Sequence, residues 1–177
     1  FAPSIPVLCL TATAAVKVIK DIQIEFKISD DDIVYSMDQS RTELSFKVQK
    51  TSNKLDDLQE ILVYRDKNKS INKTDAMIVF SSRANNSRTE LGVPGISQNV
   101  RRVLENANIG VFSGKKPKHF DLVSELTNIS KPAKPIKNYN EYKAEVQKQF
   151  KANQLDGIVA TKAFGMGVNK PNVRLVV

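Results

Sequence analysis

The stretch that decides the fold is DGIVATKAFGMGVNKPNVRLVV, residues 156–177. It contains two short apolar runs, 157–160 and 173–177, separated by the glycine-containing turn FGMG and the polar tetrapeptide NKPN. Apolar runs of this length bounded by glycine and proline predict buried strands. Because glycine lets the backbone approach a ligand or another segment closely, we expect the turn to be a functional loop.

The composition limits the kinds of protein that this chain can be. Its 177 residues predict one domain with a fragment of a second, and a 41% apolar share is enough for a core. A net charge of +8 favours a polyanionic partner such as nucleic acid. Cys9, the lone cysteine, excludes an internal disulfide and is predicted to be a buried thiol. A single histidine, His119, argues against a histidine-rich metal site or a Ser-His-Asp triad.

The sequence contains no signal peptide and no apolar run of membrane length. We therefore expect an intracellular protein without membrane contact, in a bacterial cytoplasm or nucleoid or in a nucleus. The chain begins at Phe1 without an initiator Met and ends inside an apolar run at Val177. Both ends are thus predicted to be cut from something longer.

Strand and helix patterns alternate along the chain. The predicted strands are 5–10, 33–37, 44–48, 76–80, 109–112, 157–160 and 173–177. The predicted helices are 14–26 capped by Thr13, one from Ser52 or Asn53 through Leu62, 96–106 and 139–153. This order predicts a parallel α/β sheet flanked by helices, with functional loops at the carboxyl ends of the strands. Those ends are 11–13, 82–83, 113–114 and 161–169.

Residues 115–137 differ in character from the rest of the chain. They hold six lysines and three prolines against two acids, Asp121 and Glu125. This composition predicts an extended surface insertion. Its lysines fit the backbone of a nucleic acid as well as they fit a solvated loop.

Two glycine patterns resemble nucleotide-binding motifs and fail on inspection. GVFSGKK, residues 110–116, is one residue short of a phosphate loop and has a lysine where the magnesium-binding hydroxyl belongs. Gly165 and Gly167 begin like a dinucleotide fingerprint, but Pro171 and the next strand leave no room for the required helix.

Four short signals remain, in the order LCLTATA (8–14), RTELSFKV (41–48), MIVFSSR (77–83) and ATKAFGMGVNKPNVR (160–174). Together they resemble the RecQ family of ATP-dependent DNA helicases, and the last is the longest and most specific. The resemblance implies a superfamily 2 motor in which ATP and Mg²⁺ bind between two RecA-like lobes. Residues 1–40 are similar to the end of the first lobe, with motif III and a connector. Residues 41–177 are similar to the second lobe, with motifs IV and V and a basic insertion at 115–138.

The same resemblance implies roles for individual residues. The DNA-binding residues would be Ser82, Arg83, Thr161 and Lys170, and the nucleotide-binding residues Gly167 and Asn169. The residues that couple ATP to DNA would be Thr11, Thr13, Gly165 and Arg174. Structural readings stand beside these roles: a salt bridge at a strand edge for Arg174, a capping serine and a solvated arginine for Ser82 and Arg83, and a strand end and helix cap for Thr11 and Thr13.

The chain departs from the family pattern in ways that matter for catalysis. It has no Walker A lysine, no DExH box and no motif VI, so we expect no catalytic residue and no activity in these 177 residues alone. VFSG at 111–114 replaces the usual Tyr-His-Ala-Gly, which removes the family's histidine. No metal site is expected, because the acids 30–32 lack the pattern of a calcium loop.

The preferred interpretation is part of a 3′-to-5′ DNA helicase that unwinds DNA in repair or recombination. Its partners would be single-stranded or forked DNA and the first lobe of the same chain. The alternative is a non-catalytic nucleic-acid-binding α/β module that uses the basic insertion. A Rossmann-type enzyme needs a glycine fingerprint after the first strand, and Thr11-Ala12-Thr13 is not one.

Overall fold

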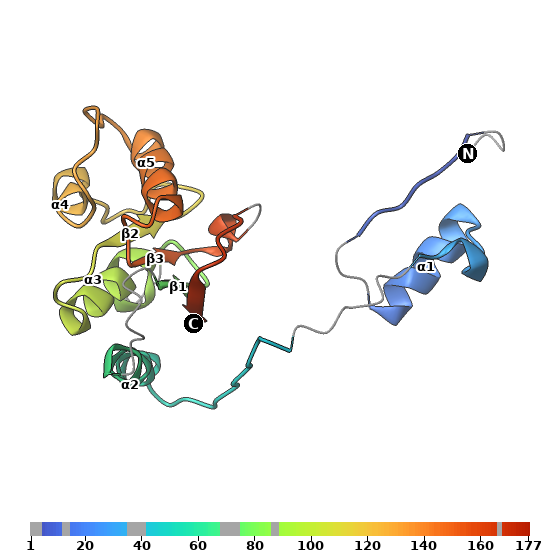
Figure 1. Ribbon diagram of the computed structural model, residues 1–177, viewed down its shortest axis with the longest axis horizontal. Helices are drawn as coiled ribbons and strands as arrows, with labels where there is room; N and C mark the ends of the chain where they lie inside the picture. Colours follow the sequence, from blue (N-terminus) through green and yellow to red (C-terminus); the bar gives the residue numbers. More distant parts are fainter. Residues whose placement is uncertain (1–4, 12–14, 35–41, 68–74, 86–88, 166–167) are drawn as a thin grey trace. The chain divides into compact units, whose positions relative to one another are not determined.

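The computed structural model describes residues 5–11, 15–34, 42–67, 75–85, 89–165 and 168–177. The chain divides into two compact units, Phe1–Gln49 and Lys50–Val177. The second unit carries the sheet and the candidate site (Figure 1). Within the described ranges, no helix is both long and apolar enough to cross a membrane.

The second unit is built on a four-stranded parallel sheet in the order β2-β3-β1-β4. The strands are β1 (Ala76–Phe80), β2 (Ile109–Phe112), β3 (Gly157–Ala160) and β4 (Val173–Val176). All four residues of β3 are buried, whereas β4 alternates between half-buried and exposed residues. The predicted parallel α/β fold is confirmed, and β4 is an edge strand rather than a buried one.

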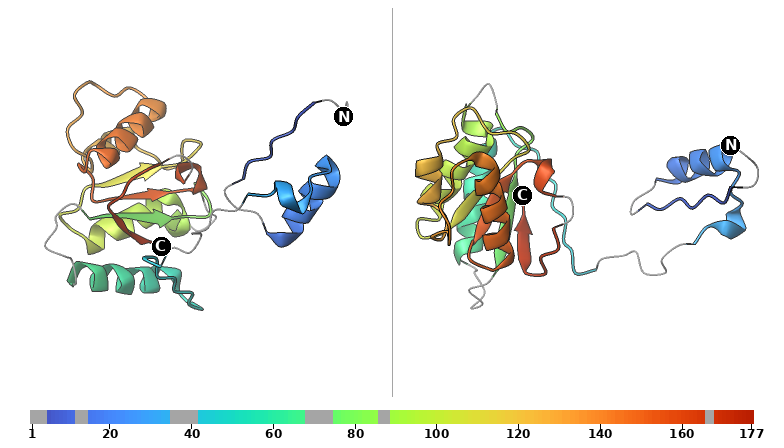
Figure 2. Two further views of the ribbon diagram at one scale, coloured as in Figure 1. Left: turned by 45° about the vertical axis from the view of Figure 1, so that its right-hand side comes forward. Right: turned by 90° about the horizontal axis from the view of Figure 1, so that it is seen from above.

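Helices cover both faces of this sheet, as Figure 2 shows. One face carries α2 (Lys54–Lys67) and α3 (Val93–Val103), and the other carries α5 (Tyr139–Lys151). Each helix buries the stripe that its apolar spacing predicts, as in Tyr142, Val146 and Phe150 of α5. This arrangement leaves the two ends of the strands open for loops.

The ends of these helices follow from their capping residues. Asn53 caps α2, because its side-chain oxygen accepts the Leu55 N–H at 3.1 Å, which confirms one of the two predicted caps. Helix α3 begins three residues earlier than predicted, with Pro94 in its first turn. Proline is tolerated there because the first helical N–H groups need no intrahelical partner.

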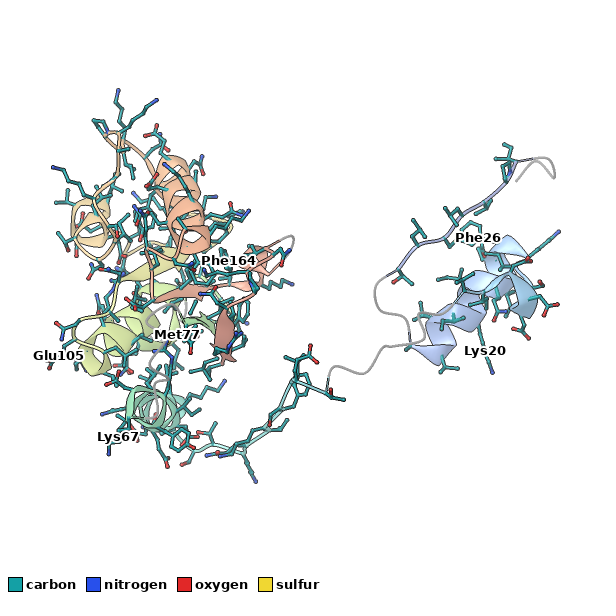
Figure 3. The ribbon with its side chains drawn as sticks, viewed as in Figure 1. Lys20, Phe26, Lys67, Met77, Glu105 and Phe164 are labelled. Atoms are coloured by element: carbon teal, nitrogen blue, oxygen red, sulfur yellow. The ribbon has the colours of Figure 1, made fainter. Side chains whose placement is uncertain are left out.

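Two glycines of the sheet sit where a neighbouring side chain leaves no space for a Cβ. A Cβ on Gly110 of β2 would lie 2.8 Å from Val146 Cγ1, and one on Gly157 of β3 would lie 2.6 Å from Met77 Cγ. Gly110 therefore serves the packing of α5 onto the sheet, in agreement with the rejection of GVFSGKK as a phosphate loop. Figure 3 labels Met77 in the middle of the sheet.

The prediction of an extended insertion at 115–137 is wrong for residues 122–126, which form a helix, whereas residues 131–137 form no helix or strand and are mostly exposed. Asp121 caps a short helix, α4 (Leu122–Leu126), by accepting N–H groups of Val123 and Ser124. Phe120 is buried, with its ring centroid 4.7 Å from that of Tyr139. The Phe120 ring also lies 5.0 Å from that of Tyr142, so Phe120 anchors the segment to α5. The lysine count of the segment did not predict this packing.

A buried polar network fixes the same segment. Glu125 of α4 accepts two hydrogen bonds from Arg101 of α3, at 2.6 and 3.1 Å, and one from the Tyr142 hydroxyl at 3.2 Å. The ion pair is well shielded, with side-chain exposures of 15% for Arg101 and 9% for Glu125. Three helices are thus joined around one carboxylate.

The outer edge of β2 is covered by side chains. Arg101 donates to the Ile109 carbonyl at 2.6 Å, and the Tyr142 hydroxyl accepts the Val111 N–H at 3.3 Å. At the end of the strand, the Tyr139 hydroxyl accepts the Ser113 N–H at 2.9 Å and donates to the Ser113 carbonyl at 3.2 Å. These contacts satisfy backbone groups that an edge strand would otherwise leave unpaired.

The first unit differs most from the sequence-based predictions. Helix α1 (Val16–Phe26) forms, with Ala15 at its N-cap and no side-chain cap, while Thr13 lies outside the described residues. The predicted strands 5–10 and 44–48 do not form, and Phe46 and Val48 are 85% and 99% exposed. At 33–34 there is no strand either, and 35–37 lie outside the described part. Cys9 is exposed rather than buried.

Candidate nucleic-acid site

Three hydroxyl side chains stand just beyond the carboxyl ends of neighbouring strands. They are Ser81 after β1, Ser113 after β2 and Thr161 after β3. The register pairs Phe112 with Ala160 and Phe80 with Ala160, so all three residues occupy the same row of the sheet. This row is the edge at which parallel sheets place their ligands.

Two of these hydroxyls are committed to the fold. Ser81 Oγ donates to the carbonyls of Arg83 at 2.8 Å and Leu91 at 3.0 Å. Ser113 Oγ lies 2.6 Å from the Lys115 carbonyl and 2.7 Å from the Tyr139 hydroxyl. Both side chains therefore stabilise local backbone and are not available to a ligand.

Thr161 differs from both serines. Its N–H continues the ladder to the Phe112 carbonyl at 3.0 Å, and its carbonyl accepts the Phe164 N–H at 3.0 Å. Its hydroxyl makes no hydrogen bond to any residue that the structure describes, although the residue is only 8% exposed. A hydroxyl held in place by a fixed backbone, with its own bonding capacity unused, suits contact with an incoming oxygen or N–H.

The loop after Thr161 is held by an aromatic anchor. Phe164, labelled in Figure 3, is buried. Its ring lies edge-on to Phe112 and Phe150, with ring centroids 5.0 and 5.7 Å away. A Cβ on Gly165 would come within 3.8 Å of Phe80 Cζ, so the loop lies close to the end of β1. Gly167, the predicted nucleotide-binding glycine, falls outside the described residues.

Ser82 and Arg83 follow β1 and are exposed. The Arg83 N–H donates to Ser81 Oγ at 3.4 Å, and its carbonyl accepts from the same hydroxyl. The backbone of this turn is therefore fixed while both side chains face solvent, beside the row that contains Thr161.

Lys170 lies near the amino-terminal end of β1, opposite the row that contains Thr161. The neighbouring Asn172 carbonyl accepts the N–H of Ala76, which is the first residue of β1. The Lys170 ammonium donates to Asn153 Oδ1 just past the end of α5 and stands 4.8 Å from the centroid of the Phe150 ring. Partial burial lowers the pKa of this ammonium.

Asn153 organises the end of α5 and the loop beside it. Its φ of 59° is left-handed, and Gln154 N–H bonds to the Gln149 carbonyl at 2.9 Å, as in a Schellman cap. Besides Lys170, the Asn172 side chain donates to the same Oδ1 at 3.0 Å. The sequence signal was an asparagine at the end of a helical periodicity, which sequence reasoning did not use.

The remaining predicted residues are spread out. Asn169 is exposed. Arg174 is also exposed and donates to the Pro171 carbonyl at 2.8 Å, so that a carbonyl takes the place of the acid considered for it. Thr11 belongs to the first unit and Thr13 lies outside the described residues. The structure thus brings together Thr161, Gly165, Ser82 and Arg83, and it separates Lys170 from them.

Comparisons with known proteins point to helicases. Over 37 residues, 21% of this chain, it is 54% identical to the ATP-dependent DNA helicase Q1 of Mus musculus. It is 59% identical over 32 residues to the probable ATP-dependent DNA helicase RecS of Bacillus subtilis, and 50% over 38 residues to a putative ATP-dependent RNA helicase of Acanthamoeba polyphaga mimivirus. No family model matches the chain.

These matches are short but agree in kind. Each spans 6% or 7% of the length of the relative concerned. They support a relation to ATP-dependent helicases, and the parallel sheet flanked by helices is compatible with a RecA-like motor lobe. Whether this chain contacts nucleic acid in the manner of a helicase depends on Thr161, Ser82 and Arg83.

Proposed function

We propose that this chain is part of a RecQ-type, 3′-to-5′ DNA helicase that acts in DNA repair or recombination. Residues 41–177 would be the second motor lobe, and residues 1–40 would belong to the first lobe of the same chain. ATP and Mg²⁺ would bind between the lobes. Asn169 and Gly167 would face the nucleotide, and Thr11, Thr13, Gly165 and Arg174 would couple it to DNA.

The observation that carries this proposal is the Thr161 hydroxyl. It stands at the carboxyl edge of the sheet, within a rigid backbone and without an intramolecular hydrogen bond among the described residues. A neutral hydroxyl of this kind donates well to a phosphate oxygen, and such contacts position nucleic acid without reading its sequence. Ser82 and Arg83 on the adjoining turn would extend the phosphate track, with Lys170 as a more distant contact.

The test is ATP hydrolysis by the full-length gene product, with and without single-stranded DNA. We expect DNA-stimulated hydrolysis, and we expect Thr161→Val to reduce the stimulation because the hydroxyl that contacts phosphate is lost. Loss of one such contact corresponds to roughly 10-fold weaker coupling or binding. Unwinding of forked substrates with opposite overhangs measures the polarity.

Ser113→Ala is the matched control, because Ser113 occupies the equivalent position on β2 and its hydroxyl is already bonded within the protein. This variant should retain DNA stimulation. A full-length protein that hydrolyses no ATP in the presence of DNA would contradict the motor function. Equal stimulation in the wild type and Thr161→Val would remove Thr161 from the site and leave the motor function standing.

A further inference from the structure

A groove of about 680 Å³ runs along the outer side of α3. One wall comes from α3 itself, where Gln98 and Arg102 lie one and two turns beyond Pro94. The other wall comes from segments that are distant in sequence, namely Ala84 and Asn85 after β1 and the stretch with Lys118 and His119 after β2. A groove of this size accommodates a nucleotide unit.

Hydrogen bonding holds the two distant segments together. Asn85 Oδ1 accepts the Lys118 N–H at 2.8 Å, which joins the turn after β1 to the start of the 115–138 segment. Two glycines, Gly92 and Gly95, form part of the lining and contribute only backbone to it. The hydrogen bond between Asn85 and Lys118 fixes the two segments relative to each other in one wall of the groove.

The charge of the groove is positive. Arg102 and Lys118 are exposed cations that line it, and neither forms an ion pair with an acid among the described residues. His119 adds a ring N–H, while Glu90 is the acid among the described lining residues. Two cations that line one cavity attract an anion, and Arg offers the planar donor pattern that fits phosphate.

The position of the groove near Ser82 and Arg83 favours the phosphate backbone of a nucleic acid as the anion. Asn85, in its wall, is two residues beyond Arg83, which together with Ser82 follows β1 toward the row of Thr161. A nucleic-acid strand that contacts Thr161 and Ser82 would reach the groove by continuing along the same side of the sheet. The phosphates of such a strand match the overall positive charge of the chain.

We propose that this groove binds the phosphate backbone of a nucleic-acid strand through Arg102 and Lys118, as a second contact region beyond Thr161. The proposal rests on the proposed function, because it takes nucleic acid as the ligand. It gives the 115–138 segment a role: Lys118 enters the groove because the segment is folded onto α3 and α5 by Glu125 and Phe120.

The experiment measures binding of a fluorescent oligo-dT strand to the full-length gene product by anisotropy over a range of salt concentrations. The double variant R102Q/K118Q removes the two groove cations. The control K131Q/K134Q removes two exposed lysines from the same segment and lowers the net charge by the same amount. A melting curve for each variant verifies that the fold is unchanged.

We expect R102Q/K118Q to bind roughly 10-fold more weakly and to reduce the slope of log K against log salt by about 1.4, the value for two phosphate contacts of single-stranded DNA. The control should change affinity less than about 2-fold. Equal losses in the two variants would show that only net charge matters and would overturn the groove. Unchanged binding in R102Q/K118Q would do the same.

Thr161→Val in the same assay separates the two proposals. Weaker binding in Thr161→Val together with unchanged binding in R102Q/K118Q would overturn the groove alone. No binding by the wild type would overturn both the groove and the proposed function.

Discussion

Ser113 and Thr161 occupy equivalent positions, each one residue beyond a buried strand of the same parallel sheet. The Ser113 backbone N–H and hydroxyl are hydrogen-bonded within the protein, to the Tyr139 hydroxyl and the Lys115 carbonyl. Around Thr161 the backbone is equally well fixed, yet the hydroxyl is left without a partner in the described part of the chain. A polar residue at a strand end is available to a ligand only when the fold leaves its hydrogen-bonding groups unused, and under the proposed function Thr161 is such a residue.

The largest effect is expected from breaking the network that supports the closed end of β2. Replacing Glu125 by Ala leaves the Arg101 guanidinium buried without its carboxylate, which lowers the free energy of unfolding by about 3–5 kcal/mol. Urea denaturation measures this loss. The double variant Arg101→Met/Glu125→Leu should lose less, because no charge is left unpaired. A loss below about 1 kcal/mol in Glu125→Ala would contradict the network.

A smaller effect is expected at alkaline pH, because the hydroxyls of two buried tyrosines, Tyr139 and Tyr142, bond to the backbone of β2 and the residue after it. Burial raises the pKa of the Tyr142 hydroxyl, with the Glu125 charge adding to the shift, and burial also raises the pKa of Tyr139. The folded state therefore keeps these protons when the unfolded chain loses them. Stability is complete below the ordinary tyrosine pKa of about 10 and falls above it by up to about 1.4 kcal/mol per pH unit for each tyrosine.

Urea denaturation at a series of pH values between 8 and about 11.5, on both sides of the ordinary tyrosine pKa, measures how the free energy of unfolding depends on pH. Tyr139→Phe is the control, since it removes one of the two titrating groups and should make the decline shallower. A free energy of unfolding that stays constant above pH 10 would contradict the assignment of the decline to buried tyrosines.

The smallest effects on stability compare the two strand ends directly. Ser113→Ala removes two hydrogen bonds of a buried hydroxyl and should cost about 1–2 kcal/mol. Thr161→Val loses no intramolecular hydrogen bond to a described residue and should change stability by less than about 0.5 kcal/mol. Thermal melts of both variants measure the difference, and equal losses would mean that the Thr161 hydroxyl is structurally engaged.

The sequence predicted the strands of the second unit correctly and failed in the first unit for a physical reason. Residues 76–80 and 5–10 show similar apolar runs, but among the described residues only the first run pairs with neighbouring strands. An alternating or apolar pattern shows that a segment can form a strand if a partner strand is present. The partner comes from residues far away in the chain, so the local pattern does not predict whether the strand forms.

The candidate site was predictable in part. The rule that ligand loops follow parallel strands located Thr161 and Ser82 from the sequence. It did not locate Lys170, because the loop that begins at Thr161 runs back to the other edge of the sheet and ends on Asn153. The groove was also missed, since Arg102 and Lys118 come together only through the packing of α3 against a segment that composition describes as loose.

The covered edge of β2 decides at which side of the sheet a further strand can pair. Arg101, Tyr142 and Tyr139 already occupy the outward backbone groups of Ile109, Val111 and Ser113, so a new strand has no template there. On the opposite side, β4 pairs with β1 along one flank, and its other flank meets no strand among the described residues. Any strand added to this sheet, from this polypeptide or another, would therefore join it at β4.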